Sequence, residues 1–254
     1  MPVPPVRSVT PPARYNPRMS SAAPHRPPPS AEHIGAVLLA GGLGSRMGGA
    51  DKGLQHFHGT PLALNALSRL RAQTLPPHRL MVNANRNLGA YAALGVPVWP
   101  DAQPDFAGPL AGFLAGFAHS GGAYLLTVPC DVPRFPLSLC ERLAHALQAQ
   151  NADIAMAAAP EAGDAGQPRL RRQPVFCLLR AELHHSLQQF TQGGGRKIDA
   201  WTAQHHRVIV PFDQAGDDPL AFANVNTLQE LRQLEGAAPH RPAGGNDDPA
   251  MPPP

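Results

Sequence analysis

The residues best suited to chemistry in this 254-residue chain follow an apolar run near its N-terminus. That run, residues 36–40, opens into GGLGSRMGGADK, which holds five glycines, one arginine, one aspartate and one lysine. Glycine lets the backbone approach a ligand closely and adopt positive φ angles. Successive backbone N–H groups in such a loop form a concave anion site, to which Arg46 and Lys52 add full positive charges. The composition therefore predicts a strand that leads into a phosphate-binding loop.

The spacing within this loop excludes the two most familiar nucleotide fingerprints. A dinucleotide fingerprint needs a third glycine three residues after Gly44, where the chain has Met47. A Walker A loop needs Gly-Lys followed by Ser or Thr, whereas Lys52 follows Asp51. A flexible glycine-rich surface loop is the alternative interpretation. Two basic residues placed directly after a strand argue against it.

Polar residues also follow three further apolar segments. Asn83 lies near the end of the second predicted strand, Asp101 follows the third and Asp131 follows the fourth. In a parallel sheet covered on both faces, ligands bind beyond the carboxyl ends of the strands, near the point where the strand order reverses. We therefore expect side chains from four strand ends to meet at one site.

Asp131 is the strongest single candidate for a metal ligand. It stands in the run PCDVP, where a proline on each side keeps it out of a helix and fixes its direction. Mg²⁺ prefers one or two carboxylates together with phosphate oxygens and water, so Asp131 suits a metal–triphosphate complex. The alternative role is a turn residue that caps the next helix. Asp101 has the same two interpretations, and Asn83 is either a base or ribose ligand or an ordinary turn residue.

Together these segments resemble the molybdenum cofactor guanylyltransferases, the MobA family of nucleotidyltransferases. The resemblance covers about residues 34–235 and is carried, in the family's order, by residues 39–52, 83–86, 108–112, 129–133 and 222–227. Two features depart from the family. The run TLQE after Asn226 replaces the usual TPEE, and the proline-rich tails have no counterpart.

The resemblance implies transfer of GMP from GTP to the terminal phosphate of molybdenum-molybdopterin, with release of pyrophosphate. Mg²⁺ is the implied cofactor, held by Asp131, and proteins that deliver the cofactor or mature molybdoenzymes are the implied partners. In this chemistry Arg46 holds the triphosphate, Lys52 stabilises charge at the α-phosphoryl group, and Asp131 completes the catalytic set. The implied nucleotide contacts are Leu39, Ala40, Gly41, Lys52, Asn83, Asp101 and Asp131.

Residues for the second substrate come from two segments. Asn224 and Asn226 belong to the closing motif of the family, where the acceptor is expected. Arg196 and Lys197 end a second glycine-rich loop, GGGRK, which either grips the pterin phosphate or only caps a helix.

Other functions remain open from the sequence alone. A CTP-dependent molybdopterin cytidylyltransferase, or another sugar- or alcohol-phosphate nucleotidyltransferase, fits a similar loop, and the choice of guanine rests on the resemblance. A non-catalytic nucleotide-binding adaptor would be expected to lose Lys52 or Asp131, and both are present.

Apolar segments of strand and helix type alternate along the chain. This alternation predicts an α/β fold, a single-domain, three-layer, doubly wound and mainly parallel sheet of the Rossmann-like nucleotidyltransferase type. The expected strands are residues 34–40, 80–84, 97–99, 123–128, 153–158, 175–179 and 207–211. The expected helices are residues 61–73, 88–94, 109–118, 137–148, 183–190, 198–204 and 228–234.

Proline is concentrated at both ends, with ten of 31 in residues 1–30 and six after Ala237. These tails lack hydrophobic periodicity, so we expect residues 1–31 and 237–254 to be disordered and residues 32–236 to form the nucleotidyltransferase domain. Met19 is an alternative start. The N-terminal tail is basic but carries only four scattered arginines, so no nucleic-acid partner is expected. No apolar run is long enough for a membrane helix, and we expect a cytoplasmic protein whose three cysteines are buried thiols.

Overall fold

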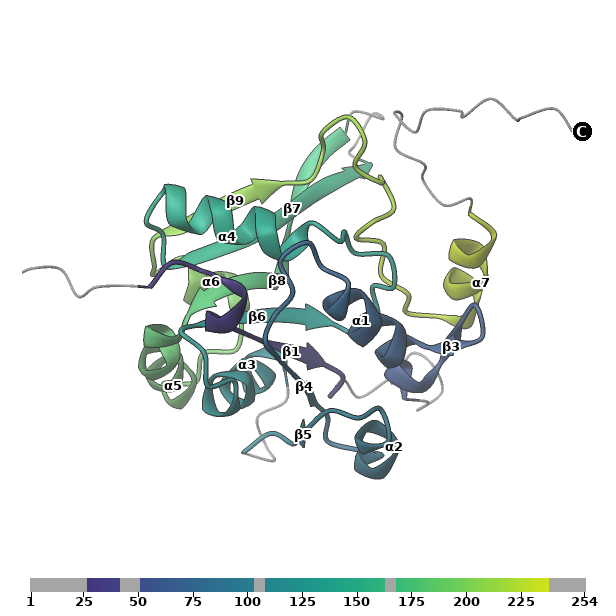
Figure 1. Cartoon of the computed structure of the whole chain (residues 1–254), viewed down its shortest axis with the longest axis horizontal. Coiled ribbons are helices and arrows are strands. Elements are labelled where there is room, and N and C mark those ends of the chain that lie inside the picture. The colour runs from purple at the N-terminus through teal and green to yellow at the C-terminus, as the bar shows by residue number, and fades with distance from the viewer. Residues whose placement is uncertain (1–26, 42–50, 103–107, 163–167, 238–254) are drawn as a thin grey trace, which may run out of the picture.

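The computed structural model describes residues 27–41, 51–102, 108–162 and 168–237 (Figure 1). A seven-stranded sheet runs through the molecule in the order β5-β4-β1-β6-β8-β7-β9. Its strands are β1 (Ile34–Leu39), β4 (Arg79–Asn83), β5 (Val98–Trp99), β6 (Tyr124–Pro129), β7 (Ile154–Ala162), β8 (Pro168–Arg180) and β9 (Arg207–Pro211). The helices are α1 (Leu62–Arg71), α2 (Leu88–Ala92), α3 (Pro109–His119), α4 (Leu139–Ala149), α5 (His184–Gln192), α6 (Ile198–Thr202) and α7 (Leu228–Gly236).

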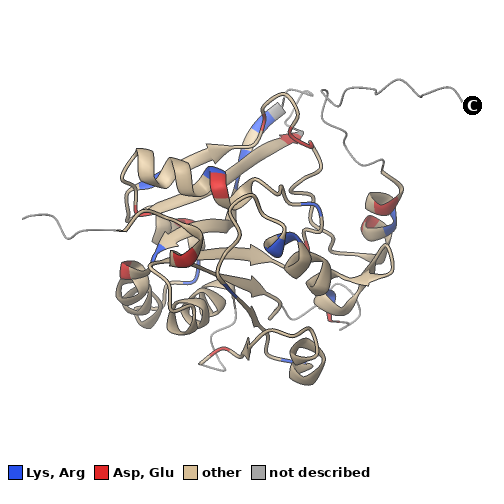
Figure 2. Ribbon diagram, in the orientation of Figure 1, with Lys and Arg blue, Asp and Glu red and all other residues tan. Residues whose placement is uncertain are grey.

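Helices cover both faces of the sheet, as the alternating segments predict. Successive residues of a strand point to opposite faces. In β1, Ala36 and Leu38 accordingly pack into a core shared with α1 and α4, whereas Val37 packs into a second core shared with α3, α5 and α6. The three layers are visible in Figure 1. Charged residues lie mainly on helices, loops and the far end of the β7-β8 hairpin (Figure 2).

The sheet is mainly parallel around its centre. β1 pairs in parallel with β4 on one side and with β6 on the other, and β5 and β9 also join by parallel pairing. β8 runs antiparallel to both β6 and β7. After β1 the chain builds β4 and β5 on one side and then returns to β6 on the other side. The strand order therefore reverses between β1 and β6, whose last residues, Leu39 and Pro129, are register partners.

The β7-β8 hairpin differs from the sequence prediction, which placed a loop between residues 158 and 175. The two strands instead continue to Ala162 and from Pro168, and form an arm that extends beyond the sheet. The register shifts between Met156 and Ala158, so that residues 173–176 lie opposite Ala157 alone. Pro174 falls in this bulge, where the ladder does not need the N–H group that proline lacks. The predicted strand began only at residue 175, seven residues after the start of β8, because Pro174 interrupts the strand pattern.

A small outer cluster fastens the C-terminal segment to the N-terminal half. It joins the short hairpin of β2 (His56–Phe57) and β3 (Thr60–Pro61), the start of α1, and α7. Its buried members are Phe57, Leu62, Val225, Leu231 and Leu234. Strands of two residues are too short to produce a hydrophobic period, so the sequence did not predict this hairpin.

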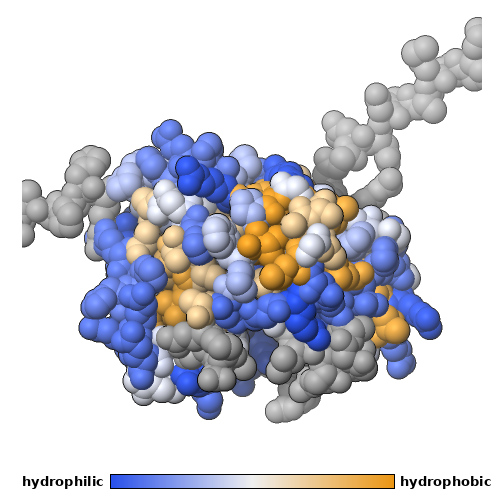
Figure 3. Space-filling view, turned by 90° about the horizontal axis from the view of Figure 1, so that it is seen from below, coloured by the Kyte–Doolittle hydropathy of each residue, from blue (hydrophilic) through white to orange (hydrophobic). Residues whose placement is uncertain are grey.

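Most of both proline-rich tails lies outside the described residues. Pro27, at the start of the described chain, accepts a hydrogen bond from the Tyr124 hydroxyl. Seen from below, the surface is a mixture of hydrophilic and hydrophobic areas (Figure 3). Within the ranges that the structure describes, no helix has the length and hydropathy needed to cross a bilayer.

Gly116 allows α3 to lie close to the central strands. A Cβ atom at Gly116 would lie 2.8 Å from Cγ1 of Val37 and 2.9 Å from Cδ2 of Leu125. We expect Gly116→Val to lower the free energy of unfolding by about 1–3 kcal/mol through overpacking, measured by urea denaturation. Gly89→Val is the matched control, since a Cβ atom at that exposed position of α2 meets nothing within 4 Å. Equal effects of the two substitutions would contradict this account of the α3 packing.

Candidate active site

A cleft of about 1200 Å³ opens beyond the carboxyl ends of β1, β4, β5 and β6. This is the side of the sheet on which the strand order reverses, where ligands bind in open α/β sheets. The residues expected to contact a nucleotide all line its wall: Leu39, Ala40, Gly41, Lys52, Asn83, Asp101 and Asp131. Arg46, the remaining candidate catalytic residue, lies outside the described residues. The structure thus brings together side chains from four strand ends, as the sequence predicts.

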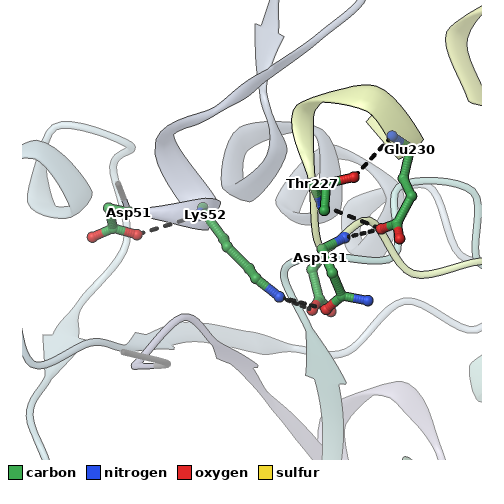
Figure 4. Close-up of polar contacts among 7 residues, drawn as sticks. Asp51, Lys52, Asp131, Thr227 and Glu230 are labelled. Atoms are coloured by element: carbon green, nitrogen blue, oxygen red, sulfur yellow. Dashed lines mark hydrogen bonds and ion pairs between the residues drawn. The ribbon is translucent and has the colours of Figure 1, made fainter. Parts of the chain in front are cut away.

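Lys52 and Asp131 form the charged centre of the cleft (Figure 4). Nζ of Lys52 lies 3.3 Å from Oδ2 of Asp131, and it donates a 2.7 Å hydrogen bond to Oδ1 of Asn226. Each side chain of the ion pair is 21% exposed, so both charges still face the cleft. The backbone N–H of Val225 donates to the carbonyl of Asp131. A cation and a carboxylate are therefore held side by side where a phosphate chain could reach both.

Asp51 fixes the turn from which Lys52 projects. The Asp51 side chain is buried, and it accepts hydrogen bonds from the N–H of Gly53, from Nδ2 of Asn87 and from the hydroxyl of Tyr91. Burial raises the pKa of Tyr91, and its hydrogen bond to Asp51 raises it further, so the hydroxyl stays protonated and donates. These bonds hold the 3₁₀ turn η3 (Lys52–Leu54) against α2. The Asp-Lys pair of the sequence is thus a buried anchor followed by a cation that lines the cleft.

A second polar network occupies the wall formed by β4 and β5. Nδ2 of Asn83 and Nδ2 of Asn85 each donate to one carboxylate oxygen of Asp101, both at 2.8 Å. The backbone N–H of Asp101 donates in return to Oδ1 of Asn85. Asp101 is therefore a fixed acceptor at the cleft wall, suited to N–H groups of a base or hydroxyl groups of a ribose.

Two glycines let this wall close tightly around the strand ends. A Cβ atom at Gly112 of α3 would lie 2.5 Å from Oδ1 of Asn83 and from Cδ2 of Leu39. One at Gly41 would lie 3.0 Å from Nδ2 of Asn85. Because Gly41 and Gly112 have no side chain, their backbone can lie close to Asn83 and Asn85.

The residues expected to bind the acceptor lie in two neighbouring cavities. Asn224 and Asn226 both line the main cleft, but Asn226 contacts Lys52. Arg196 and Lys197 line a neighbouring hollow of about 350 Å³, which shares Pro109, Pro174 and Val175 with the cleft. Arg196 donates to the carbonyl of Thr191 near the end of α5, and Lys197 precedes α6. Their loop thus connects two helices and also faces the hollow.

The arm of the β7-β8 hairpin adds cleft residues that the sequence prediction missed. Arg171, Arg172 and Gln173 line the same cleft as the predicted nucleotide contacts. Arg171 pairs with Glu161 across the hairpin, and Arg172 lies 3.9 Å from Asp199. The available signal was the dense basic run RLRR, residues 169–172, which lies within the segment that the prediction assigned to a loop.

Cys130 stands beside Asp131 but is not suited to act as a nucleophile. Its thiol is buried, and burial raises its pKa, with further increases from the nearby carboxylates of Asp131 and Asp51. A nucleophilic cysteine needs the opposite shift, toward the thiolate. The buried-thiol interpretation holds for Cys140 and Cys177 as well.

Comparisons with known proteins agree with this geometry. The family model described as the MobA-like NTP transferase domain matches residues 36–208. A molybdenum cofactor guanylyltransferase of Albidiferax ferrireducens is 62% identical over 205 residues, which cover 81% of this chain and 97% of that protein. The chain belongs to the molybdenum cofactor guanylyltransferase family. Another guanylyltransferase, from an Acidovorax species, is 62% identical over 80% of this chain and 95% of its own length.

A solved structure has a similar fold. The crystal structure of molybdopterin-guanine dinucleotide biosynthesis protein A from Archaeoglobus fulgidus matches with a TM-score of 0.61 at 19% identity, covering 79% of this chain and 96% of that one. The predicted family and the predicted nucleotidyltransferase class of this guanylyltransferase are therefore confirmed.

The contact between Tyr91 and Asp51 provides a stability test of the Lys52 anchor. We expect Tyr91→Phe to lower the free energy of unfolding by about 1–3 kcal/mol, because it removes a donor from a buried carboxylate. Urea denaturation of Tyr91→Phe, Asp51→Asn and the double variant measures the coupling. Because the two side chains are in contact, the double variant should lose less than the sum of the single losses. Strict additivity would show that Tyr91 and Asp51 act independently.

Proposed function

We propose that this protein transfers GMP from GTP to the terminal phosphate of molybdenum-molybdopterin, giving the guanine dinucleotide form of the cofactor and pyrophosphate. The observation that carries this proposal is the Lys52–Asp131 pair at the strand-order switch point of a guanylyltransferase family member. A cation next to a potential metal ligand is the arrangement that nucleotidyl transfer needs, since charge develops on both the transferred and the leaving phosphates.

In this proposal the residues of the chain mainly position phosphates and stabilise charge. Lys52 stabilises the charge that develops at the α-phosphoryl group, and the backbone around Gly41 approaches the phosphates. Arg46 remains a predicted phosphate ligand. Asn83 and Asp101 hold the nucleoside end. The attacking oxygen belongs to the acceptor phosphate, which is already ionised at neutral pH, so the reaction needs no general base from the protein.

The residues present fit a Mg²⁺ ion held largely by its substrate. Asp131 presents a carboxylate to the cleft, and Mg²⁺ takes few protein ligands when phosphates and water supply the rest. Among the described residues, no cluster of three or more His, Cys, Asp or Glu side chains has metal-binding geometry, which agrees with a site completed by the triphosphate. Bound Mg²⁺ would supply neutralisation of phosphate charge.

The acceptor is proposed to bind in the part of the cleft lined by Asn224 and in the adjoining hollow. Asn224 lies on the cleft wall, and Arg196 and Lys197 line the adjoining hollow, so these residues remain candidates for binding the pterin phosphate. A cytoplasmic location and contacts with cofactor-delivery and molybdoenzyme-maturation proteins remain predictions of the sequence.

Substitutions at the charged centre test the catalytic roles. We expect Lys52→Met and Asp131→Asn each to lower the rate of pyrophosphate release from GTP by roughly 10²–10³-fold, because each removes a positioned charge. The comparison is made with purified, folded variants at saturating Mg²⁺ and molybdopterin. Arg71→Ala, an exposed residue of α1, is the control and should keep the wild-type rate. Near-normal turnover in either cleft variant would overturn the assigned role.

A nucleotide panel tests the proposed substrate. We expect pyrophosphate release when the protein is incubated with Mg²⁺, molybdopterin and GTP, and little release with CTP or ATP in place of GTP. Omission of molybdopterin and chelation of Mg²⁺ by EDTA are the controls, and both should abolish release. Release with CTP alone would replace guanine by cytosine in the proposal and leave the roles of Lys52 and Asp131 unchanged.

A further inference from the structure

We propose that Glu230, in the first turn of α7, is a positioning residue that sets the place of Lys52 through Asn226. The part of this proposal that concerns catalysis rests on the proposed function, whereas the part that concerns Lys52 itself does not. Glu230 lies beyond residues 36–208, the range that the family model matches. The proposal therefore gives the C-terminal helix a role in the active site.

The carboxylate of Glu230 does more than cap its helix. Thr227 and Glu230 form a capping box, in which Thr227 Oγ1 accepts from the N–H of Glu230 and the Glu230 carboxylate accepts from the N–H of Thr227. The same carboxylate oxygen also accepts a 2.6 Å hydrogen bond from the N–H of Asn226, one residue further out (Figure 4). A capping box needs only the first two bonds. The third bond fixes the backbone of Asn226, whose side chain binds Lys52.

Asn226 is fixed on its other side as well. The preceding residue, Val225, is 1% exposed and packs with Leu231 and Leu234 of α7 and with Leu62 of α1. The N–H of Val225 donates to the carbonyl of Asp131. The backbone of Asn226 therefore has little freedom, and its side-chain oxygen reaches Nζ of Lys52 at 2.7 Å.

The contact with Asn226 gains importance when Asp131 is occupied. Lys52 has a flexible four-carbon stem, so its ammonium position depends on its acceptors. In the structure these are Asn226 at 2.7 Å and Asp131 at 3.3 Å. Once the Asp131 carboxylate binds Mg²⁺, as in the proposed function, Asn226 is the acceptor that keeps Lys52 in place. Loss of the Glu230 carboxylate would then free Asn226 to shift, and the Lys52 ammonium group would lose its fixed position.

The chain offers an internally referenced test, because it contains only two lysines, Lys52 and Lys197. Trace acetylation of the native protein with acetic anhydride, followed by mass spectrometry, gives the reactivity of Lys52 relative to Lys197. The variants are Glu230→Ala and Glu230→Gln, since glutamine can keep the acceptor role of a capping box. Glu235→Ala is the matched control, because Glu235 lies at the other end of α7 and also accepts a 2.6 Å bond from a distant backbone N–H, that of His58.

We expect Glu230→Ala to raise the relative acetylation of Lys52 several-fold and to lower kcat for pyrophosphate release by about tenfold, the effect typical of one hydrogen bond to a charged group. Glu230→Gln should restore both values toward wild type, and Glu235→Ala should change neither. Because Glu230 acts through Asn226, the double variant Asn226→Ala/Glu230→Ala should have the same kcat as Asn226→Ala alone. Unchanged Lys52 acetylation in folded Glu230→Ala would overturn the inference. If Glu230→Ala raises Lys52 acetylation but the wild-type protein releases no pyrophosphate, the proposed function is contradicted and the positioning role is supported.

Discussion

The parallel pairing of β1 with both β4 and β6 is the constraint on which the site depends. Three strands that run side by side in the same direction place their carboxyl ends at one edge, and the chain reverses its winding between β1 and β6. Leu39 to Gly41, Asn83 and Asp131 are thereby brought to one cleft, although they come from three distant parts of the chain. Gly112 and Gly116 allow α3 to lie close enough to these strands to form the cleft wall.

Within that frame, Lys52 is held by contacts that span most of the fold. Its turn is anchored by the buried Asp51, and its ammonium contacts Asp131, 79 residues away, and Asn226, 174 residues away. The outer cluster of Phe57, Leu62, Val225, Leu231 and Leu234 joins the segment that follows Lys52 to the segment that contains Asn226. A long lysine side chain loses conformational freedom when it is fixed, and the protein offsets this cost with acceptors that are themselves anchored. This arrangement explains why a helix far along the chain contributes to the charged centre.

The two basic elements beside the cleft have different structural origins. Arg196 and Lys197 belong to the loop between α5 and α6. Arg171 and Arg172 belong to the β7-β8 arm, just before the bulge around Pro174, and line the cleft. Thr127 fills the gap in the ladder at this bulge, donating to the carbonyl of Val175 and accepting from the N–H of Cys177. The Thr127 side chain thus joins β6 to the bulged segment of β8 at the residue where the pairing of these two strands ends.

The sequence by itself determined the layer architecture, the order of the strands and helices, and the residues that follow each strand, because hydrophobic period and glycine and proline positions are local signals. It also carried the family resemblance that the comparisons confirm. Only the tertiary structure decided that Asn226 binds Lys52, that Asp51 is a buried anchor, and that the β7-β8 strands continue past Pro174. Those features arise from contacts between residues far apart in the chain, and no local pattern records which distant partner a polar side chain will meet.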